Sequence, residues 1–97
     1  MPFEIQFVAA AKRQLGGFSA NQRAAILGAI EIQLSDEPTV ETRNRKRLRQ
    51  NPIAPWELRV SKMRVFYDVE GSSKVTILAI GIKRRNRLYI DDEEIQL

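Results

Sequence analysis

The stretch from residue 56 to residue 69, WELRVSKMRVFYDV, alternates apolar and polar side chains on both sides of a polar break at Ser61 and Lys62. Alternation with a period of two is typical of strands that bury one face, and two such runs around a short break predict an antiparallel hairpin. A slip of one residue would move every apolar side chain to the opposite face, so the pattern fixes the pairing of the strands. This hairpin therefore constrains the fold more than any other segment.

The predicted pairing gives the hairpin one apolar side, with three facing pairs: Trp56 with Tyr67, Leu58 with Val65, and Val60 with Met63. The other side sets Arg59 opposite Arg64 and Glu57 opposite Phe66. Like charges that face each other directly destabilise a sheet. Two interpretations follow: the arginines splay into solvent with Glu57 and Asp68 as counter-ions, or they form a site for an anion.

The remaining segments predict an α+β fold in which a helical hairpin packs on an antiparallel sheet. A capping box formed by Ser19 and Gln22 marks the start of the second helix. The apolar stripe of that helix is expected to face the core and comprises Ile26, Ile30 and Leu34 with Leu27, Ala29 and Ile32 beside them. The order β-α-α-β-β-β fits one domain over residues 1–97. Its predicted elements are a strand at 3–8, helices at 9–15 and 20–34, a polar connection at 39–55, strands at 56–60, 63–70 and 75–82, a short edge strand at 88–90, and a last helical turn or frayed end at 91–97.

Positive charge is concentrated in the middle of the chain, although the net charge is only +4. Residues 41–64 carry eight basic and two acidic side chains. A focused positive field attracts polyanions, most commonly RNA or DNA, whereas the alternative is a solvated surface that keeps the protein soluble. The candidate RNA-binding residues are Arg43, Arg45, Lys46, Arg47, Arg49, Lys62 and Arg84.

The composition also excludes several classes of site, because the chain contains no histidine and no cysteine. Disulfides and thiolate metal sites are absent, a zinc enzyme is unexpected, and catalysis would have to use Lys, Arg, Tyr or carboxylate groups. We expect no metal and no cofactor. No apolar run is long enough to span a bilayer, and the N-terminus lacks the pattern of a signal peptide, so we expect a cytoplasmic protein without a membrane partner.

A second group of cations is expected to join the facing arginines. The start of the second hairpin strand should lie beside the end of the following strand. Three cations would then emerge at the same end of the sheet as Arg64, with Tyr89 a few residues later; they are Lys83, Arg84 and Arg85. Such a cluster is suited to bind a phosphate group.

This cluster would suit the cleavage of RNA, because RNA carries its own nucleophile, the 2′-hydroxyl group. Guanidinium groups would stabilise the negative charge that develops on the phosphorane. A lysine crowded by other cations can act as acid or base, and Tyr89 can transfer a proton or stack on a base. Neither a metal ion nor a histidine is required for this chemistry.

The runs WELRVSKMRVFYDV and VTILAIGIKRRNRLYI resemble the C-terminal half of RelE/ParE-family toxins of bacterial type II toxin–antitoxin systems, and the basic run KRLRQNPIAPWELRV fits the same pattern. The resemblance covers essentially the whole chain. It implies a toxin that is neutralised by a cognate antitoxin. RelE-like members cut mRNA in the ribosomal A site, whereas ParE-like members inhibit DNA gyrase on a similar scaffold.

The resemblance also implies roles for single residues. Arg64 would stabilise the transition state, and four further positions match the family's functional residues: Arg59, Lys83, Arg85 and Tyr89. Glu57 departs from the pattern, because some ribonuclease members have a lysine there, and residues 61–63 replace the Gly-Asp-aromatic turn of relatives.

Three functions are therefore expected in order of preference: a ribosome-dependent mRNA endoribonuclease, a gyrase inhibitor, and a degenerate toxin that binds only antitoxin and nucleic acid. For each of them we expect an acidic or amphipathic antitoxin segment to lie across residues 41–64.

Overall fold

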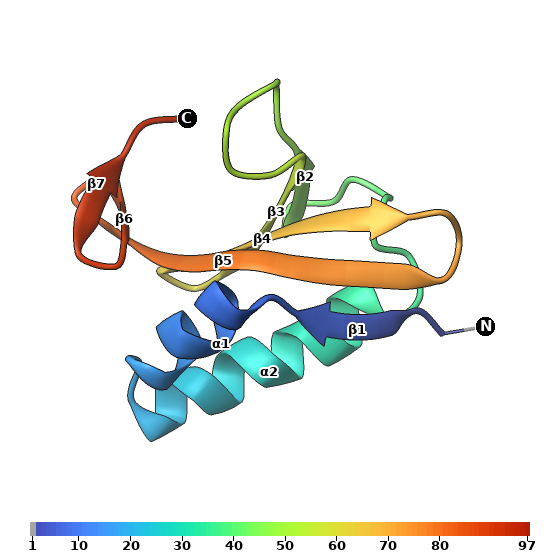
Figure 1. Cartoon of the computed structure of the whole chain (residues 1–97), viewed down its shortest axis with the longest axis horizontal. Coiled ribbons are helices and arrows are strands. Elements are labelled where there is room, and N and C mark those ends of the chain that lie inside the picture. Colours follow the sequence, from blue (N-terminus) through green and yellow to red (C-terminus); the bar gives the residue numbers. More distant parts are fainter. Residues whose placement is uncertain (1) are drawn as a thin grey trace.

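A computed structural model of the chain describes residues 2–97 and shows a twisted seven-stranded sheet with two helices against one face (Figure 1). The sheet runs in the order β2-β3-β4-β5-β6-β7, and β1 pairs with β5 beside that path. The elements are β1 (Glu4–Phe7), α1 (Ala9–Gly16), α2 (Ala20–Leu34), β2 (Arg45–Arg47), β3 (Trp56–Val60), β4 (Met63–Glu70), β5 (Lys74–Arg84), β6 (Arg87–Ile90) and β7 (Glu93–Ile95). The predicted α+β class is confirmed.

Three details of the sheet differ from the sequence-based expectation. The pair β1–β5 is parallel, whereas the other pairs are antiparallel. The predicted polar connection contains the edge strand β2, which pairs with β3. The predicted helical turn at the C-terminal end is wrong: Asp91 and Asp92, with φ of 54° and 65°, form a tight turn that returns the chain as β7. Two successive positive φ angles suit the right-handed twist of a hairpin and cannot continue a helix.

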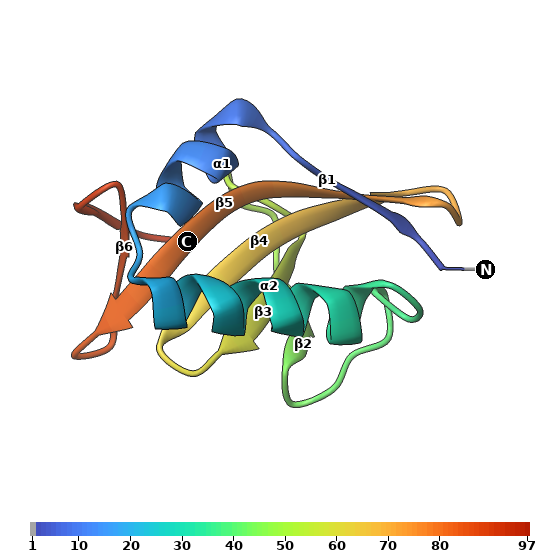
Figure 2. The ribbon, with the colours of Figure 1, turned by 90° about the horizontal axis from the view of Figure 1, so that it is seen from below.

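The face of the sheet that carries α1 and α2, here called the helix face, contains the larger core. Leu58, Val65, Tyr67 and Ile77 are completely buried there and belong to one cluster with residues of α2. Figure 2 shows α2 running beneath β3 and β4 while α1 lies beneath β5. The apolar side predicted for the hairpin is therefore confirmed as the core side.

The helix α2 begins as predicted, with Ser19 and Gln22 bonded to each other's backbone N–H groups. Ile26, Ile30 and Leu34 are buried, as expected. The wider stripe is wrong in part, because Leu27 is 44% and Ile32 is 77% exposed. Only one narrow side of α2 reaches the sheet.

The opposite face of the sheet, here called the loop face, is covered in part by the segment 48–55 and by β6 and β7, which rise from the sheet on the side away from the helices (Figure 1). Asn51 holds this segment together, because its amide donates to the carbonyls of Arg49 and Ala54 and accepts from two backbone N–H groups. Phe66 is fully buried beneath it. Strand β5 is thus covered on both faces, as its continuous apolar sequence predicts.

Candidate functional site

The hairpin of β3 and β4 has the predicted register, with Arg59 directly opposite Arg64 and Glu57 opposite Phe66. The turn closes at Ser61, whose φ of 56° lies in the left-handed region. Successive side chains of a strand point to opposite faces. Both arginines therefore lie on the loop face, while Leu58 and Val65 between them lie on the helix face.

The same register brings further charged residues to the loop face. Lys46 of β2 is paired with Glu57, and Gly81 of β5 is paired with Arg64. Lys83 lies two residues beyond Gly81 on the same face, and its backbone N–H donates to the carbonyl of Lys62 at 2.8 Å. The structure thus places four cations from four strands on one side of the sheet, which we call the basic face: Lys46, Arg59, Arg64 and Lys83.

Arg64 has the most constrained side chain of the basic face. Its Nη1 donates to the carbonyl oxygens of Ser61 and Met63, both at 2.8 Å, so the guanidinium folds back over the turn. Its Nε is buried and has no hydrogen-bond partner among residues 2–97. Burial lowers the pKa of Arg64, the charge of Arg59 lowers it further, and Glu57 acts in the opposite direction. The side chain therefore retains an unused donor in a position where an additional negative charge would be favourable.

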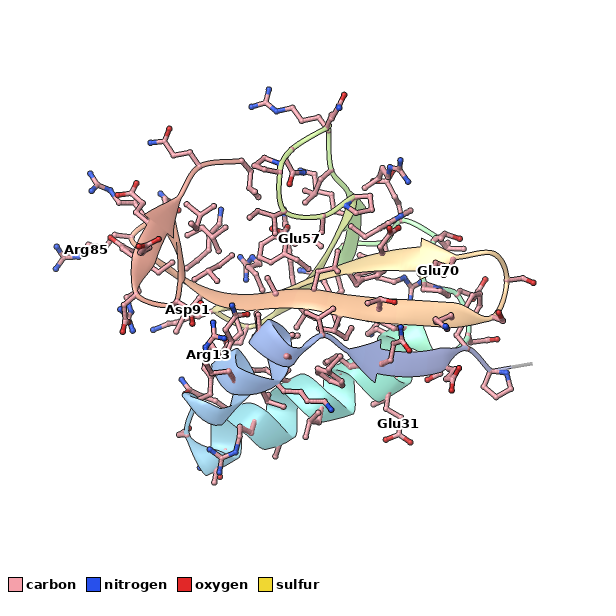
Figure 3. The ribbon with its side chains drawn as sticks, in the orientation of Figure 1. Arg13, Glu31, Glu57, Glu70, Arg85 and Asp91 are labelled. Atoms are coloured by element: carbon pink, nitrogen blue, oxygen red, sulfur yellow. The ribbon has the colours of Figure 1, made fainter. Side chains whose placement is uncertain are left out.

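Of the two facing arginines, only Arg59 forms an ion pair within the described chain, and its partner is Glu57. It is only 5% exposed, and its Oε1 lies 3.4 Å from Nε of Arg59. Figure 3 shows Glu57 on the side of the sheet away from the helices. The predicted counter-ion is thus present for Arg59, whereas Arg64 contacts backbone carbonyls instead of a carboxylate.

Tyr89 lies on the opposite face of the sheet from the arginines. It is paired with Ile82, which is itself paired with Met63 of the helix-face core. Arg84 covers its ring, with Cζ 5.8 Å from the ring centroid. Both residues line a cavity of about 230 Å³ against the end of α1. The expected convergence of Tyr89 with Arg64 is therefore not found.

Arg85 is also separated from the basic face. It forms the β5–β6 turn with Asn86, where φ is 52° and 67°, respectively. Its side chain points away from the molecule in Figure 3. The turn thus distributes its cations in three directions: Lys83 to the basic face, Arg84 to the helix face, and Arg85 outward.

The other predicted RNA-binding residues have different environments. Arg43, Lys46, Arg49 and Lys62 are exposed, and Arg49 reaches the carbonyl of Leu97 at 3.4 Å. Arg47 is exposed as well, and its guanidinium lies 5.7 Å from the centroid of the Trp56 ring on the helix side of the strand.

The expectation that Arg45 binds RNA does not fit its position, because this residue is only 8% exposed. Its Nε donates to the carbonyl of Val40 at 2.8 Å, and its Nη1 donates to the backbone carbonyl and side-chain oxygen of Gln33. These bonds fasten the start of β2 to the end of α2. We therefore remove Arg45 from the set of residues that can contact a nucleic acid.

Sequence reasoning missed the importance of Gly81 for the basic face. A Cβ atom there would lie 2.6 Å from the carbonyl oxygen of Tyr89 and 2.8 Å from a side-chain carbon of Ile90. Strand β6 can therefore cross close to β5 only because position 81 has no side chain. The signal in the sequence is a single glycine within the long apolar run of residues 75–82.

Within residues 2–97, no group of three His, Cys, Asp or Glu residues is placed to hold a metal ion. None of the described helices is long and apolar enough to cross a membrane.

Comparison with known proteins shows a similarity to a solved structure. No protein-family model and no curated protein sequence matches the chain significantly. Among solved structures, a chain of the toxin–antitoxin complex RelBE2 from Mycobacterium tuberculosis is similar, with a TM-score of 0.70, 25% sequence identity, and coverage of 86% of this chain and all of that chain. This similarity in fold and sequence supports a place for the chain in a toxin–antitoxin family with the RelE-like fold.

Proposed function

We propose that residues 1–97 form the toxin domain of a toxin–antitoxin pair and act in the cytoplasm as a RelE-like, ribosome-dependent mRNA endoribonuclease. The similarity to the RelBE2 complex supports the toxin role. A cognate antitoxin neutralises the protein. Ribosomes and mRNA are the targets, and cleavage requires no metal.

The observation that carries this proposal is the facing pair Arg59 and Arg64 with Lys83 beside it on the basic face. Two guanidinium groups held on adjacent strands match the oxygens of a phosphate, which accepts paired N–H donors. The Nε of Arg64 is a donor that no protein group satisfies in the described chain. An RNA phosphate bound here would offset the repulsion between the two arginines.

Cleavage would proceed by attack of the 2′-oxygen on the adjacent phosphorus. A base removes the 2′-hydroxyl proton, the 2′-oxygen–phosphorus bond forms, and the bond from phosphorus to the 5′-oxygen breaks. An acid then protonates the departing 5′-oxygen. Arg64 and Arg59 stabilise the additional negative charge of the phosphorane, a type of contribution that is worth about 10²- to 10³-fold per donor in other enzymes.

Two groups of the loop face that lie next to the facing arginines can transfer protons, namely Glu57 and Lys83. Glu57 is almost completely buried and is held against Arg59 at 3.4 Å, so it serves as a counter-ion. Lys83 is only partly buried and lies diagonally across from Arg64, which makes it the better candidate. Tyr89 is given no proton-transfer role here, because it lies on the helix face.

Exposed cations on and outside the basic face would hold the phosphates that flank the cleaved bond and the ribosomal RNA. These residues are Lys46 of the basic face and Arg43, Arg49, Lys62 and Arg85 outside it. Such contacts are electrostatic and independent of sequence, so their loss should weaken binding and lower its dependence on salt. Arg47 and Arg84 are placed over aromatic rings and contribute charge from the helix side.

The decisive experiment adds the purified protein to ribosomes stalled on a defined mRNA and maps the new 5′ ends by primer extension. The wild type should cut at the codon in the A site, and Arg64→Ala should reduce the rate at least about 100-fold. Lys12→Ala is the control, because it removes an exposed cation of α1 on the opposite side of the sheet, outside the proposed RNA-binding set. Equal cleavage by wild type and Arg64→Ala would refute the role of the arginine pair.

The same experiment tests two alternative functions. They are favoured because Glu57 forms an ion pair with Arg59, and because Tyr89 lies on the opposite face of the sheet from Arg64. A protein with this arrangement could bind antitoxin and nucleic acid without cutting RNA, or could inhibit DNA gyrase. Ribosome binding without new 5′ ends would indicate the first. Absence of ribosome binding together with inhibition of gyrase supercoiling would indicate the second.

A further inference from the structure

A cleft of about 480 Å³ lies on the loop face, between the segment 48–55 and the strands β4 and β5. Its apolar lining consists of partly buried side chains, Leu48 and Ile53 from the segment and Leu78 from β5. Sites for small molecules typically enclose about 300–1,000 Å³ behind such an apolar lining. In Figure 1 the segment rises from the sheet as an open loop on the side away from the helices. The cleavage mechanism above makes no use of this cleft.

The segment that forms the outer wall of the cleft is fixed by its own hydrogen bonds. The backbone N–H of Leu48 donates to the carbonyl of Pro55 at 2.8 Å and closes the loop. Within the loop, the side chain of Asn51 bonds to backbone groups on both sides of itself. Pro52 and Pro55 further restrict the rotation of the backbone. A wall fixed in this way loses little conformational entropy when a ligand binds, so the cleft is pre-formed.

Among the described residues that line the cleft, only Asp68 is acidic. It lies on the loop face, because it follows Tyr67 of the helix-face core and is paired with Thr76. Its Oδ1 accepts from the backbone N–H of Val69 at 2.7 Å. Within residues 2–97 its carboxylate forms no ion pair, so the structure does not use it as a counter-ion of the facing arginines. The side chain is exposed and is therefore available to a ligand.

The groups around the cleft determine the class of ligand. Arg49 is exposed at the cleft, and the basic residues of 41–64 favour a ligand with negative charge. Asp68, in contrast, can only accept hydrogen bonds when it is ionised. The apolar lining between them suits a flat ring. A nucleotide of single-stranded RNA combines the three features, because it has a phosphate, a flat base and N–H donors on the edge of the base.

Guanine matches a carboxylate better than the other bases of RNA do. Its Watson–Crick edge presents two neighbouring donors, N1–H and the N2 amino group, which can pair with the two oxygens of one carboxylate. Adenine and cytosine present an acceptor beside their amino group, and uracil presents an acceptor on each side of its single N–H. Each of these three bases would therefore bring an acceptor against the carboxylate of Asp68.

We propose that the cleft is a guanine subsite for bound RNA, in which Asp68 accepts from the Watson–Crick edge of the base and Arg49 contacts the phosphate. The inference rests on the proposed function, because the RNA at the basic face supplies the base. Asp68 follows Arg64 by four residues on β4, which is about 13 Å along a strand. The two sites are thus far enough apart to hold different nucleotides of one RNA strand.

Binding of RNA that cannot be cleaved tests the subsite directly. The probes are fluorescent hexamers of 2′-O-methyl uridine, which lack the nucleophilic hydroxyl, with guanine, hypoxanthine or adenine at one position. By fluorescence anisotropy, the wild type should bind the guanine hexamer about tenfold more tightly than the adenine hexamer. Hypoxanthine lacks only the N2 amino group of guanine and should give an intermediate affinity. Equal affinity for the three hexamers would overturn the proposal.

Asp68→Asn separates recognition of the base from the effect of charge. Loss of a negative charge should strengthen the binding of every hexamer slightly, but an amide offers one donor and one acceptor, so the preference for guanine should fall below about twofold. Glu70→Gln is the matched control, because Glu70 is exposed near the far end of β4 and does not line the cleft (Figure 3). It should keep the tenfold preference. Equal preferences in the two variants would overturn the proposal.

Guanosine 5′-monophosphate distinguishes RNA from a free nucleotide as the ligand. It should compete at least about 100-fold more weakly than the guanine hexamer, because it lacks the phosphates that reach the basic face. Equal affinity would assign the cleft to a free nucleotide and overturn the RNA subsite. The proposed cleavage fails separately: a protein that cuts no RNA but prefers guanine would refute the nuclease and support the subsite. A protein that cuts RNA without this preference would do the opposite.

Discussion

The two faces of the sheet are built from the same strands but are stabilised in different ways. On the helix face Leu58, Val65 and Tyr67 are completely buried against α2. On the loop face the residues between them are Arg59, Arg64 and the buried Phe66, covered only in part by a polar segment. Neighbours along a strand point to opposite faces. A core residue such as Leu58 is therefore followed directly by a residue of the basic face such as Arg59. Paired substitutions of neighbouring residues can therefore separate stability from function.

The largest expected effect on stability comes from Leu58→Ala on the helix face. Removing a fully buried leucine should lower the free energy of unfolding by about 2–5 kcal/mol, through lost burial and a residual cavity. Arg64→Ala on the loop face should change it by less than about 1 kcal/mol, because this arginine is repelled by Arg59 and contacts only turn carbonyls. Urea unfolding measures both values. If Arg64→Ala were as unstable as Leu58→Ala, loss of cleavage could not be assigned to chemistry.

Gly81→Ala probes the tight packing of β6 against β5 on the loop face. The added methyl group would lie 2.6 Å from the carbonyl oxygen of Tyr89, so β6 must shift away from β5. We expect a loss of about 1–3 kcal/mol in the free energy of unfolding, and a loss of RNA cleavage because Lys83 moves with the strand. Gly28→Ala is the control, since it meets no neighbour and should stabilise the isolated chain by about 1 kcal/mol.

Arg45 and Lys46 extend the comparison to the edge strand β2. Arg45→Ala should lower the free energy of unfolding by about 1–3 kcal/mol, because it removes the donors for the carbonyls of Val40 and Gln33. Lys46→Ala should change stability by less than about 0.5 kcal/mol but weaken RNA binding and flatten its salt dependence. Unfolding curves and salt titrations of RNA binding distinguish the two. Equal effects of both variants on RNA binding would return Arg45 to the binding surface.

The features that were predictable from the sequence are those that depend on residues close together in the chain. The register of β3 and β4 follows from the alternation on both sides of Ser61 and Lys62, and the start of α2 follows from its capping box. Strand β2 offers no such signal, because its three residues are all basic and its partner is β3. Likewise, Arg45 is buried because it donates to the carbonyls of Val40 and Gln33, and only the folded chain brings these groups together.

The site was predictable only in part, because the resemblance to a family assigns positions along the chain and not faces of a sheet. Both the argument from strand ends and the resemblance grouped Tyr89 with Arg64, whereas the structure places them on opposite faces. A signal was available, since a two-residue turn at Arg85 and Asn86 places Tyr89 opposite Ile82 on the core side. Counting residues across that turn would have separated the tyrosine from the arginines.

The smallest expected effect concerns Asp91, which connects the strands covering the loop face to helix α1. Its Oδ2 accepts from Nε2 of Gln14 and from Nη2 of Arg13, both at 3.0 Å, and Figure 3 shows Arg13 and Asp91 close together. The hydrogen bond from Gln14 and the nearby Arg13 lower the pKa of Asp91 below its ordinary value of 3.8. Its contribution to stability is therefore present above that value and is lost as the pH falls through the lower pKa of the folded state.

Thermal unfolding as a function of pH measures this contribution. Asp91→Asn should unfold at a slightly lower temperature than the wild type at pH 7, and the difference should shrink as the pH is lowered below about 4. Asp92→Asn removes the adjacent carboxylate and serves as the control. A difference for Asp91→Asn that persists unchanged in acid would mean that the shape of the turn, and not the charge of Asp91, holds β6 and β7 against α1.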